Sequence, residues 1–197
     1  MIAGHFGFAA AVKSRARAVP LWALMLATVW MDVLFVPLYA AGIEPIDPVA
    51  GTKGGYGDVI IHADYTHSLV GALVIAATFG IVAAISWGKR AGAVLGAVVF
   101  SHWVLDLPMH RADMPLWPGA PADSPRLGFG LWRSHGASIA LELAIVVAGA
   151  FLYWRAAVQT ARSAERDVTP LVRRANLIAA VLLASGLATL LLNAFNL

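Results

Sequence analysis

Five apolar segments, separated by polar stretches, are the main pattern of this sequence. They cover roughly residues 19–41, 67–87, 91–107, 136–154 and 175–196, and polar residues interrupt the last one. Each is close to the ~20 residues that a helix needs to cross a bilayer. Residues 1–12 are apolar but shorter, so they form either a half-length helix that enters the membrane or an amphipathic surface helix. The pattern predicts an all-α, polytopic membrane protein, with about five transmembrane helices and a short N-terminal half-helix in one domain, residues 1–197.

The composition indicates that the lipid bilayer is the main partner of the chain. Hydrophobic residues make up 60% and charged residues 13%, against about 25% charged in soluble domains. The mean hydropathy is +0.76. These values exclude a disordered chain and an ordinary soluble domain. The absence of Cys excludes thiolate zinc sites, Cys nucleophiles and iron–sulfur clusters.

The basic residues predict how the chain is oriented. Ten of the 14 Lys and Arg residues lie in 13–17, 89–90 and 155–174, on one side of the five segments. Cytoplasmic loops are enriched in Lys and Arg, so we expect this side to be cytoplasmic. The long loops 42–66 and 108–134 then face outward. Because the net charge of +3 comes from short loops, it indicates topology and not binding to nucleic acid.

Ionisable side chains inside the apolar segments need a common explanation. Four of them lie about 16–22 Å from the cytoplasmic end of their segment, at ~1.5 Å per residue: Asp32, His102, Asp106 and Glu142. A charge at this depth costs at least ~2.5–3.5 kcal/mol unless it has a partner. His5 reaches the same level if residues 5–17 are helical. The sequence therefore predicts that these groups, with histidines at the outer segment ends, converge on one site that opens outward.

The spacing of these residues favours a divalent metal, above all zinc. His102 and Asp106 are an i, i+4 pair on one helix face, and imidazole and carboxylate are standard zinc ligands. The predicted ligands are His5, Asp32, His62, His67, His102, Asp106 and His110. For Asp32 or Glu142 alone, a structural hydrogen bond between helices is the alternative. His135 is expected to be an interfacial residue.

The order of the short motifs carries a resemblance to a known family. The chain has Gly4-His5, then Asp32, then HADYTHS over residues 62–68 and SHWVLD over residues 101–106. This order resembles that of the bacterial membrane-bound metal-dependent hydrolases, and the H-x3-D step is distantly similar to zinc-dependent phospholipase C. The family often has Asp-x-Asp-His where this chain has Asp32-Val-Leu-Phe35, which leaves open one metal instead of two, or lost activity. The resemblance implies a protein of the bacterial inner membrane.

These observations predict a membrane-embedded, metal-dependent hydrolase that acts on a phosphate or other ester at the outer membrane face. Asp32 or Glu142 is the expected general base, and Arg111 and Tyr65 are expected to bind a lipid or lipid-phosphate substrate. Two alternatives remain: a non-catalytic accessory subunit of a larger membrane complex, and a small metal- or proton-handling transporter. Either could be a homo-oligomer.

Overall fold

The computed structural model describes residues 1–52, 54–121, 123–163 and 167–195. Within these ranges the chain forms seven α-helices, one 3-10 helix and two short β-hairpins. The helices are α1 (Ile2–Lys13), α2 (Leu21–Thr28), α3 (Trp30–Ala40), α4 (Leu69–Trp87), α5 (Lys89–Asp106), α6 (His135–Arg162) and α7 (Thr169–Phe195), with η1 (Leu131–Arg133) before α6. The strands are β1 (Ile46–Pro48), β2 (Val59–Ile61), β3 (Met114–Pro115) and β4 (Arg126–Leu127). A mostly helical protein was predicted, and the structure confirms it.

The count of membrane spans differs from the expected five. In the described residues, three helices are long and apolar enough to cross a membrane, namely α4, α6 and α7. A fourth span is possible if α2 and α3 act as one, although they are bent by 45° at their junction. The segment expected over residues 91–107 is α5, whose 18 residues include Lys89, Arg90 and Asp106. These three charges make α5 less apolar than a typical span, so the prediction of five clear spans was wrong.

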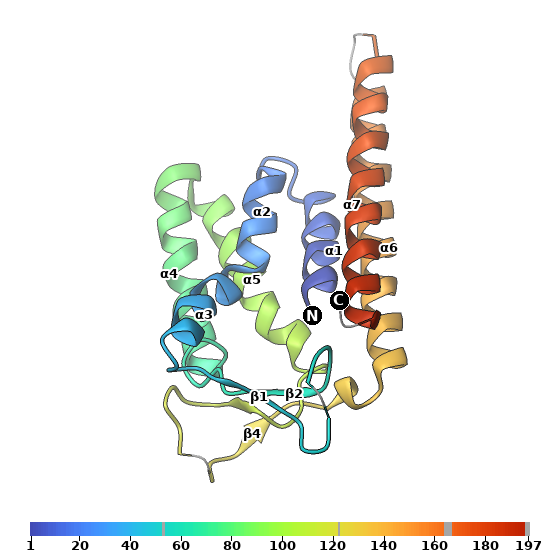
Figure 1. Cartoon of the computed structure of the whole chain (residues 1–197). Helices are drawn as coiled ribbons and strands as arrows, with labels where there is room; N and C mark the ends of the chain where they lie inside the picture. The colour runs from blue at the N-terminus through green and yellow to red at the C-terminus, as the bar shows by residue number, and fades with distance from the viewer. Residues whose placement is uncertain (53, 122, 164–166, 196–197) are drawn as a thin grey trace.

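The short helix α1 lies inside the helical assembly. It packs against α2, α6 and α7, and His5 and Ala9 on it are fully buried. Twelve residues give a length of about 18 Å, which leaves the first turn of α1 near the middle of the molecule (Figure 1). The half-length helix predicted from the sequence is therefore present. It brings His5 next to His102 of α5, on which the His5 ring stacks.

Glycines allow the close helix contacts that surround the site. A side chain at Gly149 of α6 would collide with the backbone of Gly7 in α1, so these two helices touch backbone to backbone. In the same way, a side chain at Gly96 of α5 would lie 2.9 Å from the carbonyl oxygen of Ala76 in α4. Pairs of small residues bring membrane helices together in this manner. The close approach fixes α1 and α5 relative to their neighbours.

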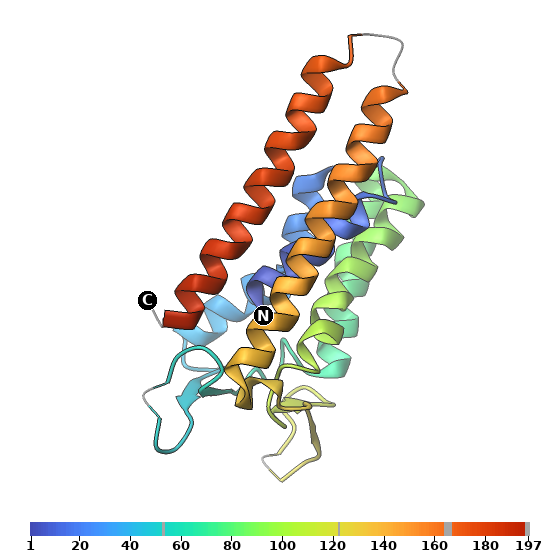
Figure 2. The same cartoon turned by 90° about the vertical axis from the view of Figure 1, so that its right-hand side faces the viewer.

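The two ends of the molecule are different. The β1–β2 hairpin pairs Ile46 with Ile61, the β3–β4 hairpin pairs Met114 with Leu127, and both hairpins gather at one end (Figure 1). At the other end, α6 and α7 extend well beyond the remaining helices (Figure 2). The hairpins belong to the two long loops that were expected to face outward, and they cover the end of the helices that carries the buried polar residues.

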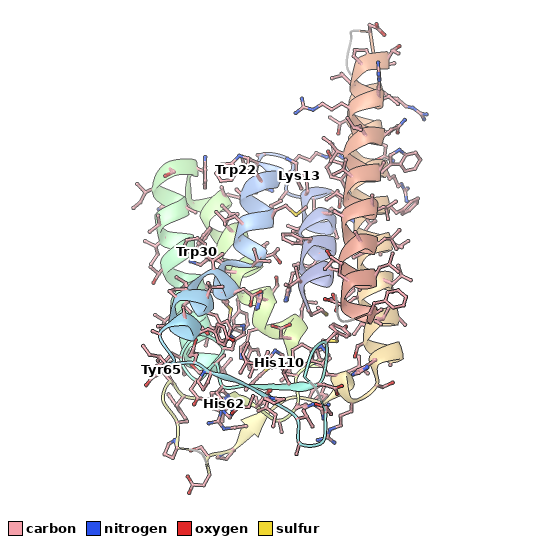
Figure 3. The ribbon with its side chains drawn as sticks, in the orientation of Figure 1. Lys13, Trp22, Trp30, His62, Tyr65 and His110 are labelled. Atoms are coloured by element: carbon pink, nitrogen blue, oxygen red, sulfur yellow. The ribbon has the colours of Figure 1, made fainter. Side chains whose placement is uncertain are left out.

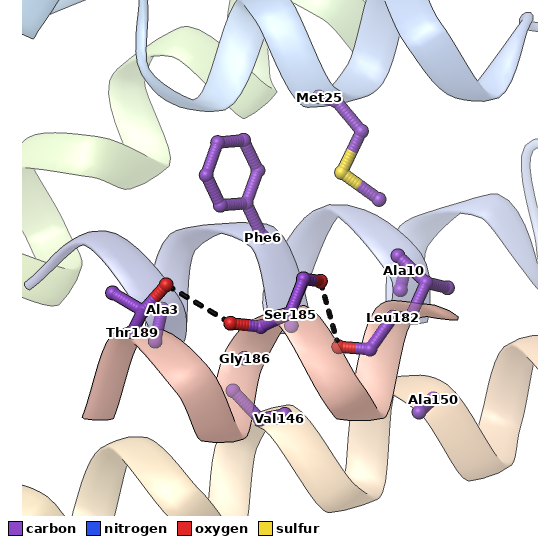
Figure 4. A pocket seen from close by; sticks show the side chains of 11 residues that line it. Ala3, Phe6, Ala10, Met25, Val146, Ala150, Leu182, Ser185, Gly186 and Thr189 are labelled. Atoms are coloured by element: carbon purple, nitrogen blue, oxygen red, sulfur yellow. Dashed lines mark hydrogen bonds between the residues drawn. The ribbon is translucent and has the colours of Figure 1, made fainter. Parts of the chain in front are cut away.

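A cavity of about 250 Å³ lies among α1, α2, α6 and α7 (Figure 4). Phe6, Met25 and Val146 contribute to its wall. The hydroxyls of Ser185 and Thr189 also reach it, but they donate to the carbonyl oxygens of Leu182 and Ser185 in their own helix. Since these hydroxyls are already engaged as donors, the cavity suits an apolar chain better than a polar ligand.

Candidate metal centre

Six predicted residues from five segments of the chain meet at the hairpin end of the helices. They are His5 of α1, Asp32 of α3, His67 just before α4, His102 and Asp106 of α5, and His110 in the loop that follows. Two donor groups within this cluster are compact enough to hold a metal ion: Asp32 with His67 and His102, and His5 with His102 and Asp106. All of these side chains are buried except Asp32, which is 36% exposed.

The distances between donor atoms match those around a bound cation. His67 Nε2 lies 3.2 Å from His102 Nε2, and Asp32 Oδ1 lies 3.4 Å from His102 Nε2 and 3.6 Å from His67 Nε2. Asp106 Oδ2 lies 3.1 Å from His102 Nε2 and 3.9 Å from His67 Nε2. A tetrahedral zinc ion with ligands at about 2.0–2.2 Å sets the ligand atoms about 3.3–3.6 Å apart. The donor atoms lie 3.1–3.9 Å apart, so the cluster could hold a metal ion.

The break between α2 and α3 orients His102. Helix α2 ends at Thr28, and Val29 is its C-cap residue. The carbonyl oxygen of Thr28 therefore does not take part in the hydrogen bonds within the helix. His102 Nδ1 lies 2.8 Å from this oxygen. A carbonyl oxygen only accepts hydrogen bonds, so Nδ1 carries a proton and Nε2 is the ring nitrogen that faces the carboxylates. The bent span thus contributes a backbone acceptor that an unbroken helix would lack.

A buried carboxylate orients His67 through a hydroxyl. Glu44 is fully buried, and its Oε1 accepts from the backbone N–H groups of Tyr65 and Thr66 at 2.7 and 2.8 Å. The Thr66 hydroxyl donates to Glu44 Oε2 at 2.8 Å, and its oxygen lies 2.9 Å from His67 Nδ1. Because this hydroxyl proton is used, the oxygen accepts from His67 Nδ1–H. His67 Nε2 then keeps its lone pair.

His110 follows the same pattern with a different acceptor. Its Nδ1 lies 2.9 Å from Asp113 Oδ1, and its Nε2 lies 3.8 Å from Asp106 Oδ2. The other oxygen of Asp113 accepts from the backbone N–H of Ile61 at 3.1 Å, which ties the loop to β2. Histidines that bind metals almost always donate the second ring N–H to a carbonyl or carboxylate. His102 and His110 are held in that way, and His67 is held by the Thr66 hydroxyl instead.

The empty hydrogen-bonding capacity of His5 and Asp106 also fits a metal centre. The His5 ring stacks on His102 with centroids 3.9 Å apart, and His5 Nε2 lies 3.2 Å from Asp106 Oδ1. Among the described residues, neither ring nitrogen of His5 nor Asp106 Oδ1 has a hydrogen-bond partner, although all three are buried and Asp106 Oδ1 lies 3.6 Å from the N-terminal ammonium group of Met1. Buried polar atoms without partners are costly. Nitrogen and carboxylate donors that face one another at these distances fit a bound divalent cation.

Four predicted site residues lie away from this cluster. His62 Nε2 pairs with Asp47 Oδ2 at 3.1 Å on the β1–β2 hairpin, and Figure 3 shows it below His110. The Arg111 guanidinium donates to the carbonyl oxygen of Gly57 at 2.9 Å. Tyr65 is about half-exposed, and its ring lies beside Gly119. The cluster does not include these side chains, so the roles predicted for them remain predictions.

The fourth is Glu142, whose two oxygens hold structural hydrogen bonds. Oε1 accepts from the Tyr56 hydroxyl at 2.7 Å, and Oε2 accepts from the backbone N–H of Gly4 at 3.0 Å. Burial and the neighbouring Glu142 carboxylate raise the pKa of Tyr56, so its hydroxyl stays protonated as a donor. Glu142 thus joins α6, the first turn of α1 and the outer loop. Both oxygens of Glu142 are therefore engaged in hydrogen bonds outside the cluster.

Glu44 and Asp113 were not among the site residues predicted from the sequence. Asp113 follows His110 by three residues, and that spacing is the signal that could have indicated it. Glu44 lies in a turn after α3 and is 22 residues from Thr66, so no local pattern connects them. Such supporting residues become visible only when the fold brings their elements together.

Comparisons with known proteins do not change this assignment. No protein-family model, curated protein sequence or solved structure matches the chain. The interpretation of the cluster therefore depends on its own geometry and on the motif order in the sequence.

Proposed function

We propose that this protein is a membrane-embedded, metal-dependent hydrolase. The observation that carries the proposal is the shared orientation of His67, His102 and His110. Each directs Nδ1 to an oxygen acceptor and Nε2 toward the carboxylates at the centre. Catalytic zinc sites typically use three protein ligands and one open position. His67, His102 and Asp106 would be the three ligands in this proposal.

Asp32 has the position of a proton acceptor. Its Oδ1 lies within 3.4–3.6 Å of the two histidine donors, and its side chain is the most exposed in the cluster. A hydrolytic water beside the ligands would pass its proton to Asp32 Oδ1. A bound divalent ion would lower the pKa of that water toward ~7 and polarise the phosphoryl or carbonyl oxygen of the substrate.

The surroundings of Asp32 favour an ester with a lipid tail. Asp32 on α3 is followed by the exposed apolar side chains Val33 and Val36 and by Phe35, whose ring packs edge-on against His67. A substrate that reaches Asp32 along this face of α3 passes apolar side chains first. A polar ester group on an apolar chain fits this route better than a water-soluble molecule does.

The test is hydrolysis by the purified protein in vesicles or mixed micelles with added Zn²⁺. Phosphatidic acid and an isoprenoid monophosphate are suitable probes, with release of inorganic phosphate as the readout, beside a short-chain carboxylic ester. We expect turnover that Asp106→Asn abolishes and that Asp47→Asn, an exposed acid on the hairpin, leaves intact. Turnover that survives Asp106→Asn, or a zinc-loaded protein that cleaves none of these esters, would contradict the proposal.

A further inference from the structure

A second cavity, unrelated to the metal centre, lies at the opposite end of the molecule. Its volume is about 660 Å³, and it is enclosed by the α1–α2 turn, the C-terminal part of α6 and the N-terminal part of α7. Three cationic side chains line it: Lys13, Arg17 and Arg174. No acidic residue lines it in the part of the chain that the structure describes. This is the end that the basic residues predict to be cytoplasmic.

The shape of the cavity follows from the different lengths of the helices. Helix α1 ends at Lys13 and α2 begins at Leu21, whereas α6 and α7 continue past this level (Figures 1 and 2). The turn between α1 and α2 therefore stands against the side of α6 and α7 and leaves a recess there. The side chains of Leu21, Ala157 and Ile178 form an apolar wall of this recess.

The charged rim of this recess has a defined local structure. Lys13 Nζ donates to the carbonyl oxygens of Arg17 and Val19, both at 2.7 Å, and closes the turn around itself (Figure 3). The guanidinium groups of Arg17 and of Arg174 on α7 are exposed. In the described part of the chain, neither forms an ion pair with a carboxylate. Two guanidinium groups with a partly used ammonium group make a site for an anion with several oxygens, since Arg matches phosphate geometry.

Aromatic side chains place this recess at a membrane interface. Trp22 lines it, is 60% exposed and meets Trp87 edge-on with ring centroids 5.7 Å apart. Tyr153 of α6 also lines it. Trp and Tyr are enriched at the level of lipid headgroups. A cationic rim at this level, directly above an apolar wall, matches a phosphate group with a hydrocarbon chain below it.

We propose that this recess binds the headgroup of an anionic phospholipid from the cytoplasmic leaflet. Arg17, Arg174 and Lys13 hold the phosphate, and the acyl chain descends along Leu21 and Ile178. Basic pockets between helices on the cytoplasmic side are suited to such headgroups. An acidic peptide would satisfy the cations but would leave the apolar wall without a partner. The occupant is therefore a lipid, which secures the short α1–α2 unit against the long α6–α7 hairpin.

The test measures lipid binding to the full-length, detergent-purified protein by native mass spectrometry and thermal unfolding. The probes are phosphatidylglycerol and, as a neutral lipid, phosphatidylcholine. The variant Arg17→Gln/Arg174→Gln removes two charges from the recess, and the matched control Arg15→Gln/Arg173→Gln removes two neighbouring charges that do not line it. We expect roughly tenfold weaker phosphatidylglycerol binding in the first variant and unchanged binding in the control.

Several results would overturn the proposal. Equal binding of both lipids by the unaltered protein would show that the charges do not select an anion. An equal loss in the two double variants would show a diffuse effect of net charge. Protection by inorganic phosphate or hexaglutamate equal to that by phosphatidylglycerol would show that the apolar wall plays no part. If the double variant unfolds without lipid, the single variants Arg174→Gln and Arg173→Gln, both at exposed positions, are compared instead. Equal phosphatidylglycerol binding by these two variants would likewise contradict the proposal.

Discussion

His67 and His102 face each other through their Nε2 atoms at 3.2 Å, although 35 residues separate them in the sequence. Each Nδ1–H is already donated, to the Thr66 hydroxyl and to the Thr28 carbonyl oxygen. Two lone pairs at this distance repel each other unless a cation or a proton lies between them. The carboxylates of Asp32 and Asp106 beside them stabilise positive charge at this position.

Removing a central histidine is expected to abolish metal binding. In His102→Ala the donor that belongs to both compact groups is lost, so the metal content should fall from about one ion per chain to near zero. His135→Ala removes an exposed histidine that pairs with Asp58 and should keep the metal. The metal content of detergent-purified protein is measured by elemental mass spectrometry after zinc loading.

His62 tests whether the ligands follow the sequence pattern or the contacts in the tertiary structure. His62 was predicted as a ligand, but the structure pairs it with Asp47. We expect His62→Ala to retain its metal in the same measurement. Loss of metal in this variant would show that the hairpin moves and that His62 reaches the centre.

The hydroxyl behind His67 is expected to tune metal affinity. Thr66→Val removes the acceptor of His67 Nδ1–H and the donor to Glu44. Changes of this kind typically weaken metal binding about 10–100-fold. Competition with a metal-binding dye measures the change, and Thr78→Val, on an exposed position of α4, is the matched control. An unchanged affinity would mean that His67 is not a ligand.

The contact between Tyr56 and Glu142 is expected to stabilise the fold. Tyr56→Phe removes a hydrogen bond to a carboxylate, which should lower the free energy of unfolding by about 1–3 kcal/mol and leave the metal content unchanged. Because burial and Glu142 raise the pKa of Tyr56 in the folded protein, this stabilisation is fully present below the ordinary tyrosine pKa of about 10. It is lost as the pH rises further.

The measurement is thermal unfolding of both proteins at several pH values. The difference in Tm should be constant between about pH 7 and 9 and decrease above about pH 10. Tyr65→Phe changes a tyrosine that is about half-exposed and should have little effect. A loss of metal in Tyr56→Phe would show instead that Glu142 belongs to the metal centre.

The backbone contact between α1 and α6 is expected to tolerate no side chain. Gly149→Ala places a methyl group against the backbone of Gly7, so α1 must move away and His5 leaves the cluster. Gly136→Ala, in the same helix, meets open space and should be neutral or stabilising by up to ~1 kcal/mol. Thermal unfolding compares the two. Equal Tm values would contradict the close packing of α1.

The sequence was enough to predict a mostly helical chain, the half-length of α1 and a cluster of buried ionisable residues. These properties depend on residue counts along one helix, because each residue adds a constant rise. The i, i+4 spacing of His102 and Asp106 is local for the same reason. A sequence can therefore predict that a polar cluster exists and which helix faces contribute to it.

The three-dimensional packing of the helices and loops selected which residues take part and how they are oriented. The break at Val29 freed the Thr28 carbonyl for His102, the hairpin turned His62 to Asp47, and Glu44 reached Thr66 from another loop. Distances between segments far apart in the chain depend on helix bending and packing, which no local pattern encodes. For this reason the sequence predicted the level of the site, and the fold selected its members.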